Sequence, residues 1–476
     1  MALLSSALPR NRARAVLTST ALSGLVVVVA LTIGVLSARS PRLAIAVVTA
    51  TALGWLVLRR AVTVLVPLAV LVLAWDSTVL PSADVSFAAK FIVLGAVAAM
   101  AVPSLMAPVE GHPPVPKPFG SGFLLLVIFA TASTAWSVDP ALSLQRGISI
   151  ALMWAAVVLA VPLSLRGDDE VSDIVRRNAL LLASLTGLGF VLGLAGLATA
   201  FQTNGRFLGL MINPNTIGYF AAPILPPAVL LAAQLGPGRR RLMLAMAVVV
   251  VAVGIALSGS RAGVLSSVVG ITVGLVVAGT FRQSRQARRA FAILAALVVA
   301  GVLAFPALGV TARLGGQGTE GFLELGGGSG RELNWGNSLP LLSEAPLFGH
   351  GLGSTPTLFP QAQSTSQRVI LGGAHNSYLE AAIDLGLVGA VLLIVLAVSG
   401  LVAAVRLSHE PGPASRLGPV FTAAIAAGLI EAVFETGMLA AGGVFAFPFW
   451  LSVSLAHSLL ARERAFSPAT STRAPT

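Results

Sequence analysis

Residues 377–404 read SYLEAAIDLGLVGAVLLIVLAVSGLVAA, a stretch in which apolar side chains continue almost without interruption. A helix needs about 20 residues to cross the hydrocarbon core of a bilayer, and this stretch exceeds that length. It lacks the alternation of a membrane barrel strand, so a helix is the structure that satisfies its backbone in lipid. The stretch therefore predicts a transmembrane helix.

The rest of the chain repeats this pattern. Of its 476 residues 56% are hydrophobic and only 10% are charged, and the mean hydropathy is +0.90, values far from those of a soluble globular domain. Windows of about 19 residues predict spans at 15–37, 42–58, 61–75, 87–106, 121–136, 147–165, 178–201, 215–235, 242–258, 262–280, 290–310, 377–404, 417–438 and 440–460. We expect an all-α polytopic membrane protein with about 12–14 transmembrane helices.

The basic residues predict the orientation. The net charge is +12, but the Lys and Arg residues form short clusters between apolar runs, which is a topology signal and argues against a nucleic-acid partner. Cytoplasmic loops retain positive charge, and most of the 30 Lys and Arg residues fall on one side of the predicted membrane. The other side holds Arg39, Arg42, Arg146, Arg206, Arg261, Arg313, Arg331 and Arg368. Both termini are therefore expected in the cytoplasm.

The predicted organisation has five parts. A cytoplasmic N-terminus at 1–14 precedes an N-terminal transmembrane bundle at 15–310, whose first run is longer than the apolar core of a signal peptide and is expected to be retained. An extracytoplasmic loop at 311–375 follows. Its stretch from Arg331 to Leu342 has the Leu and Trp spacing of a short helix. C-terminal transmembrane helices at 376–460 and a cytoplasmic tail at 461–476 complete the chain.

Three arginines and one histidine stand out on the predicted outer side, where basic residues are scarce: Arg206, Arg261, Arg331 and His375. Guanidinium groups bind phosphate in a bidentate manner, so an anionic ligand is one interpretation. The alternative is that each arginine caps a helix end or extends toward lipid phosphate. Charged residues near a membrane mark functional sites more often when they cluster, and the coincidence of these four favours the ligand.

His375 directly precedes an apolar helix and is expected at its N-terminus, where backbone N–H groups and the helix dipole favour an anion and a neutral imidazole. Asn376, Glu380 and Asp384 follow at intervals of four, so they share one helix face. Acids at this depth must face a cavity or a partner group rather than lipid. Cysteine is absent and the five histidines are scattered, so we expect no metal site and no disulfide.

Several motifs are similar to those of one family. They are Gly205-Arg206 with Asn213-Pro-Asn215, Leu257-Ser-Gly-Ser-Arg-Ala-Gly263, and a long loop with Gly330-Arg331, Trp335 and Pro346-Leu-Phe-Gly-His-Gly-Leu-Gly353. His375-Asn376 follows, then nine residues, then Gly386-Leu-Val-Gly389, which is the most specific spacing. With these motifs the chain resembles the O-antigen ligase and polymerase family of bacterial membrane glycosyltransferases.

The resemblance implies a GT-C-like enzyme of the bacterial plasma membrane that assembles surface polysaccharide. It would transfer a glycan from an undecaprenyl-diphosphate carrier to a hydroxyl of a glycan, lipid or protein acceptor on the outer face, by an inverting step without metal or other cofactor. Arg206, Arg261 and Arg331 would hold the diphosphate, His375 would accept the proton, and the long loop would act as a lid. Substrate contacts are expected from Asn215, Asn376, Tyr378, Glu380 and Trp335.

A transporter or flippase of lipid-linked glycans is the main alternative from another class. Such proteins bind their substrate at broken helices near the middle of the membrane. Pro214, Pro223, Pro226 and Pro227 are able to break the predicted span at 215–235, as that function requires. Most charged residues, however, are predicted at the outer edge of the membrane, which favours the enzyme.

Overall fold

The computed structural model describes residues 41–75, 77–78, 83–106, 112–196, 200–201, 205–279, 331–359, 373–441 and 443–466. The chain divides into two compact units, residues 1–60 and residues 61–476. The first unit contributes one described helix, α2 (Pro41–Leu58). All further elements belong to the second unit.

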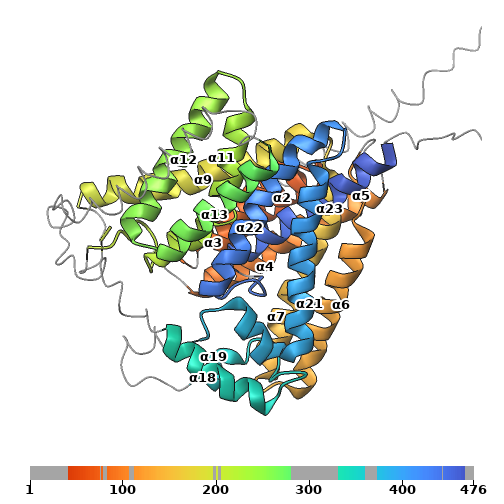
Figure 1. The fold of residues 1–476 in the computed structure, drawn as a ribbon, viewed down its shortest axis with the longest axis vertical. Coiled ribbons are helices and arrows are strands. Elements are labelled where there is room, and N and C mark those ends of the chain that lie inside the picture. The colour runs from red at the N-terminus through yellow and green to blue at the C-terminus, as the bar shows by residue number, and fades with distance from the viewer. Residues whose placement is uncertain are drawn as a thin grey trace, which may run out of the picture. The chain divides into compact units, whose positions relative to one another are not determined.

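The described part of the second unit is built from helices (Figure 1). They are α3 (Val62–Trp75), α4 (Ala83–Ala99), α5 (Ala101–Met106), α6 (Lys117–Ala132), η1 (Ser133–Trp136), α7 (Pro140–Trp154), η2 (Ala155–Ala160), α8 (Val161–Ser164), α9 (Asp168–Leu194), α10 (Asn215–Ala221), α11 (Leu225–Gln234), α12 (Arg239–Ser258), α13 (Arg261–Val277), α18 (Arg331–Glu344), α19 (Thr355–Leu358), α21 (Ser377–Leu407), η3 (Pro413–Leu417), α22 (Gly418–Phe434) and α23 (Ala446–Phe466).

Seven of the helices in the described residues are long and apolar enough to cross a membrane, or eight if the bent pair α10 and α11 is one span. Each predicted span that falls on described residues coincides with a helix or with consecutive helices, so the all-α polytopic membrane fold is confirmed. The spans predicted at 15–37 and 290–310 lie outside the described residues. The total of about 12–14 spans therefore stays a prediction.

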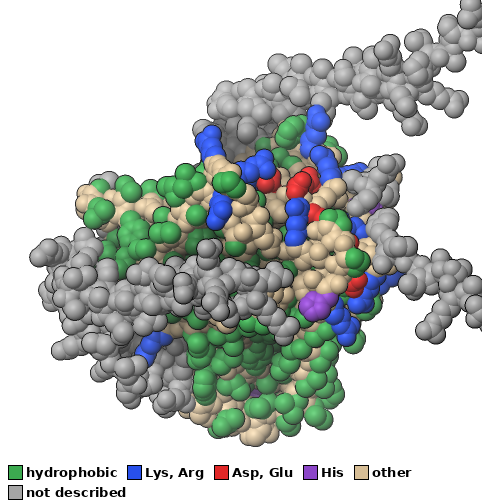
Figure 2. Space-filling view, turned by 45° about the horizontal axis from the view of Figure 1, so that its top comes forward, with side chains coloured by type: hydrophobic (Ala, Val, Ile, Leu, Met, Phe, Trp, Pro, Cys, Tyr) green, Lys and Arg blue, Asp and Glu red, His purple; other side chains and the backbone are tan. Residues whose placement is uncertain are grey.

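The bundle has two ends that differ in charge. At one end of the bundle α7, α13 and α21 begin and α12 and α22 terminate. We call it the His375 end, and α18 and α19 lie there (Figure 1). At the opposite end three ion pairs join α9, the connection around η3, and α23: Arg462–Asp168, Arg416–Asp169 at 3.1 Å and Arg464–Glu410 at 2.9 Å. Figure 2 shows basic and acidic side chains gathered over this opposite end.

Helix α22 is the most buried of the candidate spans, with 78% of its apolar window inside the protein. It packs closely against α13 through small residues. A Cβ added to Gly270 would lie 2.5 Å from the carbonyl oxygen of Ala423, and one added to Gly274 would lie 2.8 Å from the Cβ of Ala423. In membranes such small side chains allow two helix backbones to approach. This contact fixes the register between α13 and α22.

Helix α21 is broken at Gly386, whose φ of 67° and ψ of −175° are far from helical values. The break opens the helical hydrogen bonds around it, and the segment 346–351 bonds the released groups. Its own N–H groups, at His350 and Gly351, donate to the carbonyls of Ile383 and Asp384 at 2.9 and 2.8 Å. Two more bonds run the opposite way, from Leu387 N–H to Pro346 O at 2.8 Å and from Val388 N–H to Leu347 O at 3.3 Å.

Glycine is required on both sides of this contact. A Cβ on Gly386 would lie 2.1 Å from the carbonyl oxygen of Leu347, and a Cβ on Gly349 would lie 2.5 Å from the backbone of Asp384. Both residues also have φ in the left-handed region, which other residues adopt only with strain. The motif residues Gly349 and Gly386 thus serve one close backbone contact.

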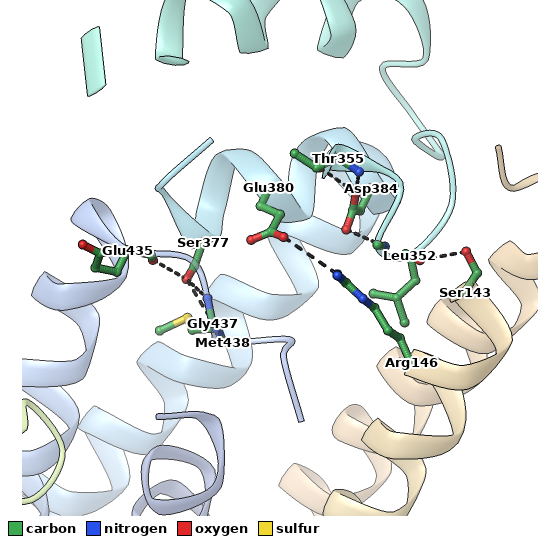
Figure 3. A network of polar contacts seen from close by, with 11 residues as sticks. Ser143, Arg146, Leu352, Thr355, Ser377, Glu380, Asp384, Glu435, Gly437 and Met438 are labelled. Carbon is green, nitrogen blue, oxygen red and sulfur yellow. Dashed lines mark hydrogen bonds and ion pairs between the residues drawn. The ribbon is translucent and has the colours of Figure 1, made fainter. Parts of the chain in front are cut away.

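The same segment is held from its other side by η1 and α7. Ser133 Oγ accepts a hydrogen bond from Leu352 N–H at 2.9 Å, and Ser143 Oγ donates to Leu352 O at 2.7 Å (Figure 3). The carboxylate of Asp384, which is 2% exposed, accepts hydrogen bonds from the N–H groups of Gly353 and Thr355 and from the Thr355 hydroxyl. The segment 346–355 is therefore fixed between α7 and α21.

We predict that Gly386→Ala destabilises the protein by at least about 1–3 kcal/mol, since a Cβ in this backbone conformation is strained and also meets Leu347. Thermal unfolding of the detergent-purified protein measures the change. Gly95→Ala in α4 is the matched control, because nothing lies within 4 Å of the added Cβ and alanine favours a helix. Equal midpoints for Gly386→Ala and the parent would contradict the assignment.

The orientation of the bundle has a direct test, because the chain has no cysteine. Gly336 lies in α18 at the His375 end and Gly236 lies between α11 and α12 at the opposite end; both are exposed and have room for a side chain. We predict that a membrane-impermeant maleimide labels Gly336→Cys in intact cells and labels Gly236→Cys only after permeabilisation. The reverse pattern would invert the proposed topology.

Candidate active site

The start of α21 is shaped by His375 and Asn376. His375 has a φ of 46°, in the left-handed region, and it turns the chain into the helix. Asn376 is the N-cap: its Oδ1 accepts hydrogen bonds from the N–H groups of Tyr378 and Leu379 at 2.9 and 3.0 Å. Asn376 thus has a capping role that the sequence did not reveal, beside the substrate contact that we predict for it.

His375 lies beside Glu435, the residue that follows α22. The distance from His375 Nδ1 to Glu435 Oε2 is 3.5 Å, and the two side chains are 33% and 17% exposed. Ser377 positions the chain at Glu435, since its hydroxyl donates to Glu435 O at 2.8 Å and accepts from Gly437 N–H at 3.0 Å (Figure 3). A carboxylate is therefore held next to the imidazole by the hydrogen bonds of a neighbouring serine.

Helix α13 brings Arg261 to the same end. The Ser266 hydroxyl in α13 donates to the buried Glu431 carboxylate in α22 at 2.7 Å. The two helices are antiparallel, so Arg261, five residues before Ser266, and Glu435, four residues after Glu431, lie about 7.5 and 6 Å further toward the His375 end. The Arg261 side chain is exposed.

Arg206 and Asn215 meet beside the turn that joins α12 to α13. Arg206 Nε donates to the Ser258 carbonyl at 2.8 Å, and its Nη2 donates to Asn215 Oδ1. The neighbouring helices are in close contact, because a Cβ added to Gly263 in α13 would lie 2.4 Å from the Cα of Gly218 in α10. We call Arg206, Asn215 and Arg261 the arginine corner. The structure thus joins Arg206 and Asn215 directly and places the start of α13, which carries Arg261, beside α10.

Glu380 is one turn after Asn376 and faces Arg146 of α7. Its carboxylate lies 3.9 Å from Arg146 Nη1, and the side chains are 20% and 31% exposed (Figure 3). Arg146 and Glu435 are the polar partners that the sequence did not identify as site residues. Their signal was present, since Arg146 is among the few basic residues predicted outside and Glu435 lies near the outer end of the span predicted at 417–438. Neither has a motif of its own.

The remaining predicted residues are placed less directly. Arg331 begins α18, but its side chain is not among those described. Trp335 is half-buried in the same helix, which packs on the first turns of α21 through a cluster that includes Leu341 and Ile383. The Tyr378 hydroxyl donates to the Leu429 carbonyl of α22 at 2.9 Å. Tyr378 therefore joins α21 to α22, beside the substrate role that we predict for it.

Two cavities in the described part of the chain lie away from these residues. One is lined by α9, the connection from α10 to α11, α22 and α23, and includes Asn178 and Pro223. The other is an apolar groove between α6 and α21, and Leu125 and Leu387 are among the residues that line it. Among the described residues no group of three His, Cys, Asp or Glu side chains is arranged to hold a metal ion. The candidate site is thus a partly exposed polar surface at the His375 end.

The fold and this arrangement define a polytopic helical membrane protein with a charged site at one end of its bundle. Residues 245–394 match the family model described as O-antigen ligase, which supports the resemblance of the chain to the O-antigen ligase and polymerase family. No curated protein matches the chain. The matched region contains Arg261, His375 and Gly386, whereas Arg146 and Arg206 lie before it. This match indicates a membrane protein with an O-antigen ligase-type function.

We predict that Asn376→Ala lowers stability by about 1 kcal/mol, because two N–H groups at the start of α21 lose their acceptor. Asn376→Asp retains an acceptor and should keep most of the stability. Thermal unfolding of the two purified variants measures the difference. An alanine variant as stable as the parent would show that the cap contributes nothing.

Proposed function

We propose that the protein transfers a glycan from an undecaprenyl-diphosphate carrier to an acceptor hydroxyl at the outer face of the bacterial inner membrane, for assembly of a surface polysaccharide. The observation that carries the proposal is the His375–Glu435 pair at 3.5 Å, at the same end of the bundle as the arginine corner. A base and a set of cations are the two requirements for displacing a diphosphate from a sugar.

The arginine corner supplies the cations. Arg206 is held in place by Ser258 O and Asn215, so its charge is oriented before substrate arrives, and such preorganised charge stabilises a leaving anion well. Arg261 is the first residue of α13, where the helix N-terminus also favours negative charge. Together with Arg331, these groups would neutralise the diphosphate without a metal ion.

His375 would act as the general base. With Nδ1 protonated and directed at the Glu435 carboxylate, Nε2 is free of its proton and able to accept one. The acceptor hydroxyl transfers its proton to Nε2 while its oxygen forms a bond to the anomeric carbon. The bond from that carbon to the carrier's phosphate oxygen breaks, and the electron pair leaves with the diphosphate. One such displacement inverts the configuration at the anomeric carbon.

The distribution of charge supports an outward-facing site. The opposite end of the bundle carries the ion-paired arginines of η3 and α23 (Figure 2), as well as Arg239, Arg240 and Arg241 at the start of α12. Such enrichment in positive charge is typical of the cytoplasmic side. The end of α23 is then cytoplasmic, as we also propose for the N-terminus, and the His375 end meets the carrier at the outer surface.

One observation favours a transporter or flippase as a second candidate. Helices α10 and α11 form a pair bent by 46°, with Pro226 and Pro227 in the first turn of α11. Broken helices of this kind bind substrates in transporters. Movement of labelled carrier-linked glycan across proteoliposomes without any glycan transfer would favour this function over the enzyme.

We predict that His375→Ala lowers the rate of glycan transfer by about 10²- to 10⁴-fold, the usual contribution of a general base. The assay gives the purified protein carrier-linked glycan and resolves the products by size and by acceptor. His409→Ala, which changes a histidine beyond the other end of α21, is the matched control and should retain full activity. Unchanged transfer by a correctly inserted His375→Ala protein would refute the role of His375.

A further inference from the structure

Arg146 and Glu380 form a mixed-charge pair at the His375 end that the proposed chemistry leaves unused. The two side chains are 31% and 20% exposed, so they are neither sealed in the core nor fully solvated. Glu380 also interacts electrostatically with His375, and its N–H bonds the Asn376 carbonyl one turn earlier in the chain. The pair therefore lies next to the base that we propose.

The pair is held by fixed backbone. A Cβ added to Gly353 would lie 2.5 Å from Arg146 Cδ, so the stem of Arg146 packs directly on the segment 346–355. That segment is bonded to Asp384, one turn beyond Glu380, through the Gly353 and Thr355 N–H groups. Arg146 thus belongs to α7 and Glu380 to α21, and the segment 346–355 joins these two helices.

The distance within the pair suits a hydroxyl group. At 3.9 Å the nearest nitrogen and oxygen are too far apart for a hydrogen bond, but one oxygen atom fits about 2.8–3.0 Å from both. A hydroxyl accepts from a guanidinium and donates to a carboxylate at once, which neither an anion nor a cation does. The pair also offers a donor and an acceptor side by side, unlike the arginine corner, so it suits an uncharged, hydroxyl-bearing ligand such as a sugar.

The position of the pair relates it to the acceptor. Figure 3 shows Arg146 on one side of the first turns of α21 and Glu435 on the other. The Glu435 side is the one that α22 occupies, and α13 packs against α22. In an inverting displacement the attacking oxygen and the leaving oxygen occupy opposite sides of the anomeric carbon. If the diphosphate binds at the arginine corner, the acceptor therefore binds on the opposite side, next to α7.

We propose that Arg146 and Glu380 form the acceptor subsite and bind a sugar hydroxyl next to the one that attacks. This inference rests on the proposed glycan transfer. Arg146 donates to the bound hydroxyl and Glu380 accepts from it, so the pair orients the acceptor toward His375 and adds nothing to the binding of the carrier diphosphate. Acceptor and donor affinities are therefore separable.

The test titrates donor and acceptor independently, with the purified protein in nanodiscs, labelled carrier-linked glycan as donor, and surface glycan from the same cells as acceptor. For Arg146→Gln and Glu380→Gln the KM for acceptor should rise about 10- to 100-fold, as expected for a lost hydrogen bond to a charged group, while the KM for donor stays unchanged. The double variant should be little worse than either single variant, because both remove contacts to one hydroxyl.

Arg146→Lys keeps the charge and most of the stem, so it tests the same contact with less risk to folding and should raise the acceptor KM by a smaller factor. Asp169→Asn, which breaks an ion pair at the opposite end, is the matched control and should change neither KM. A lower kcat with both KM values unchanged, or a higher donor KM, would overturn the subsite. No transfer by the unmodified protein would instead refute the proposed function itself.

Discussion

The arrangement of the site depends on one constraint, that a helix crossing lipid cannot leave backbone groups without hydrogen-bond partners. Helix α21 breaks at Gly386, and its released carbonyl and N–H groups are bonded by the segment 346–351 rather than by water. The break therefore binds a loop to a transmembrane helix by main-chain contacts. Because the loop also bonds η1 and α7, the first turns of α21 and the start of α7 are held together.

Two sets of charged side chains lie at the His375 end of the bundle. Near α10 and α13 the arginine corner is cationic, and His375 lies beside the Glu435 carboxylate at the same end of the bundle. Near α7, Arg146 and Glu380 place opposite charges side by side. A cationic group and a mixed-charge group match the proposed reaction, in which a charged carrier meets an uncharged hydroxyl. The capping of α21 by Asn376 fixes the start of the helix next to His375.

The sequence predicted the helices well, because long apolar runs have few alternatives in lipid. It also predicted that Asp384 would face a cavity or a partner group rather than lipid, and the structure shows a partner, the backbone around Gly353 and Thr355. It did not predict the break at Gly386, since an isolated glycine in an apolar run is compatible with a continuous helix. The spacing from His375 to Gly389 was recognised as a motif, and the structure supplies a physical reason for its first glycine.

The pairing of His375 with Glu435 lay beyond sequence reasoning for a different reason. It depends on how the start of α21 is placed against the end of α22, which the hydroxyls of Ser377 and Tyr378 fix by bonding the carbonyls of Glu435 and Leu429. Hydropathy does not encode that placement. Arg146 was missed likewise, because its nearness to Glu380 results from a segment more than 200 residues later in the chain.

The bonds between the segment 346–351 and α21 use only main-chain atoms, and this has a consequence for how the protein can vary. Side chains such as Leu347 and Phe348, which are 57% and 54% exposed, take no part in those bonds. The Phe348 ring instead contacts the rings of Phe129 and Trp136. A substitution at Leu347 that keeps the backbone conformation would therefore leave the joint between the segment and α21 in place.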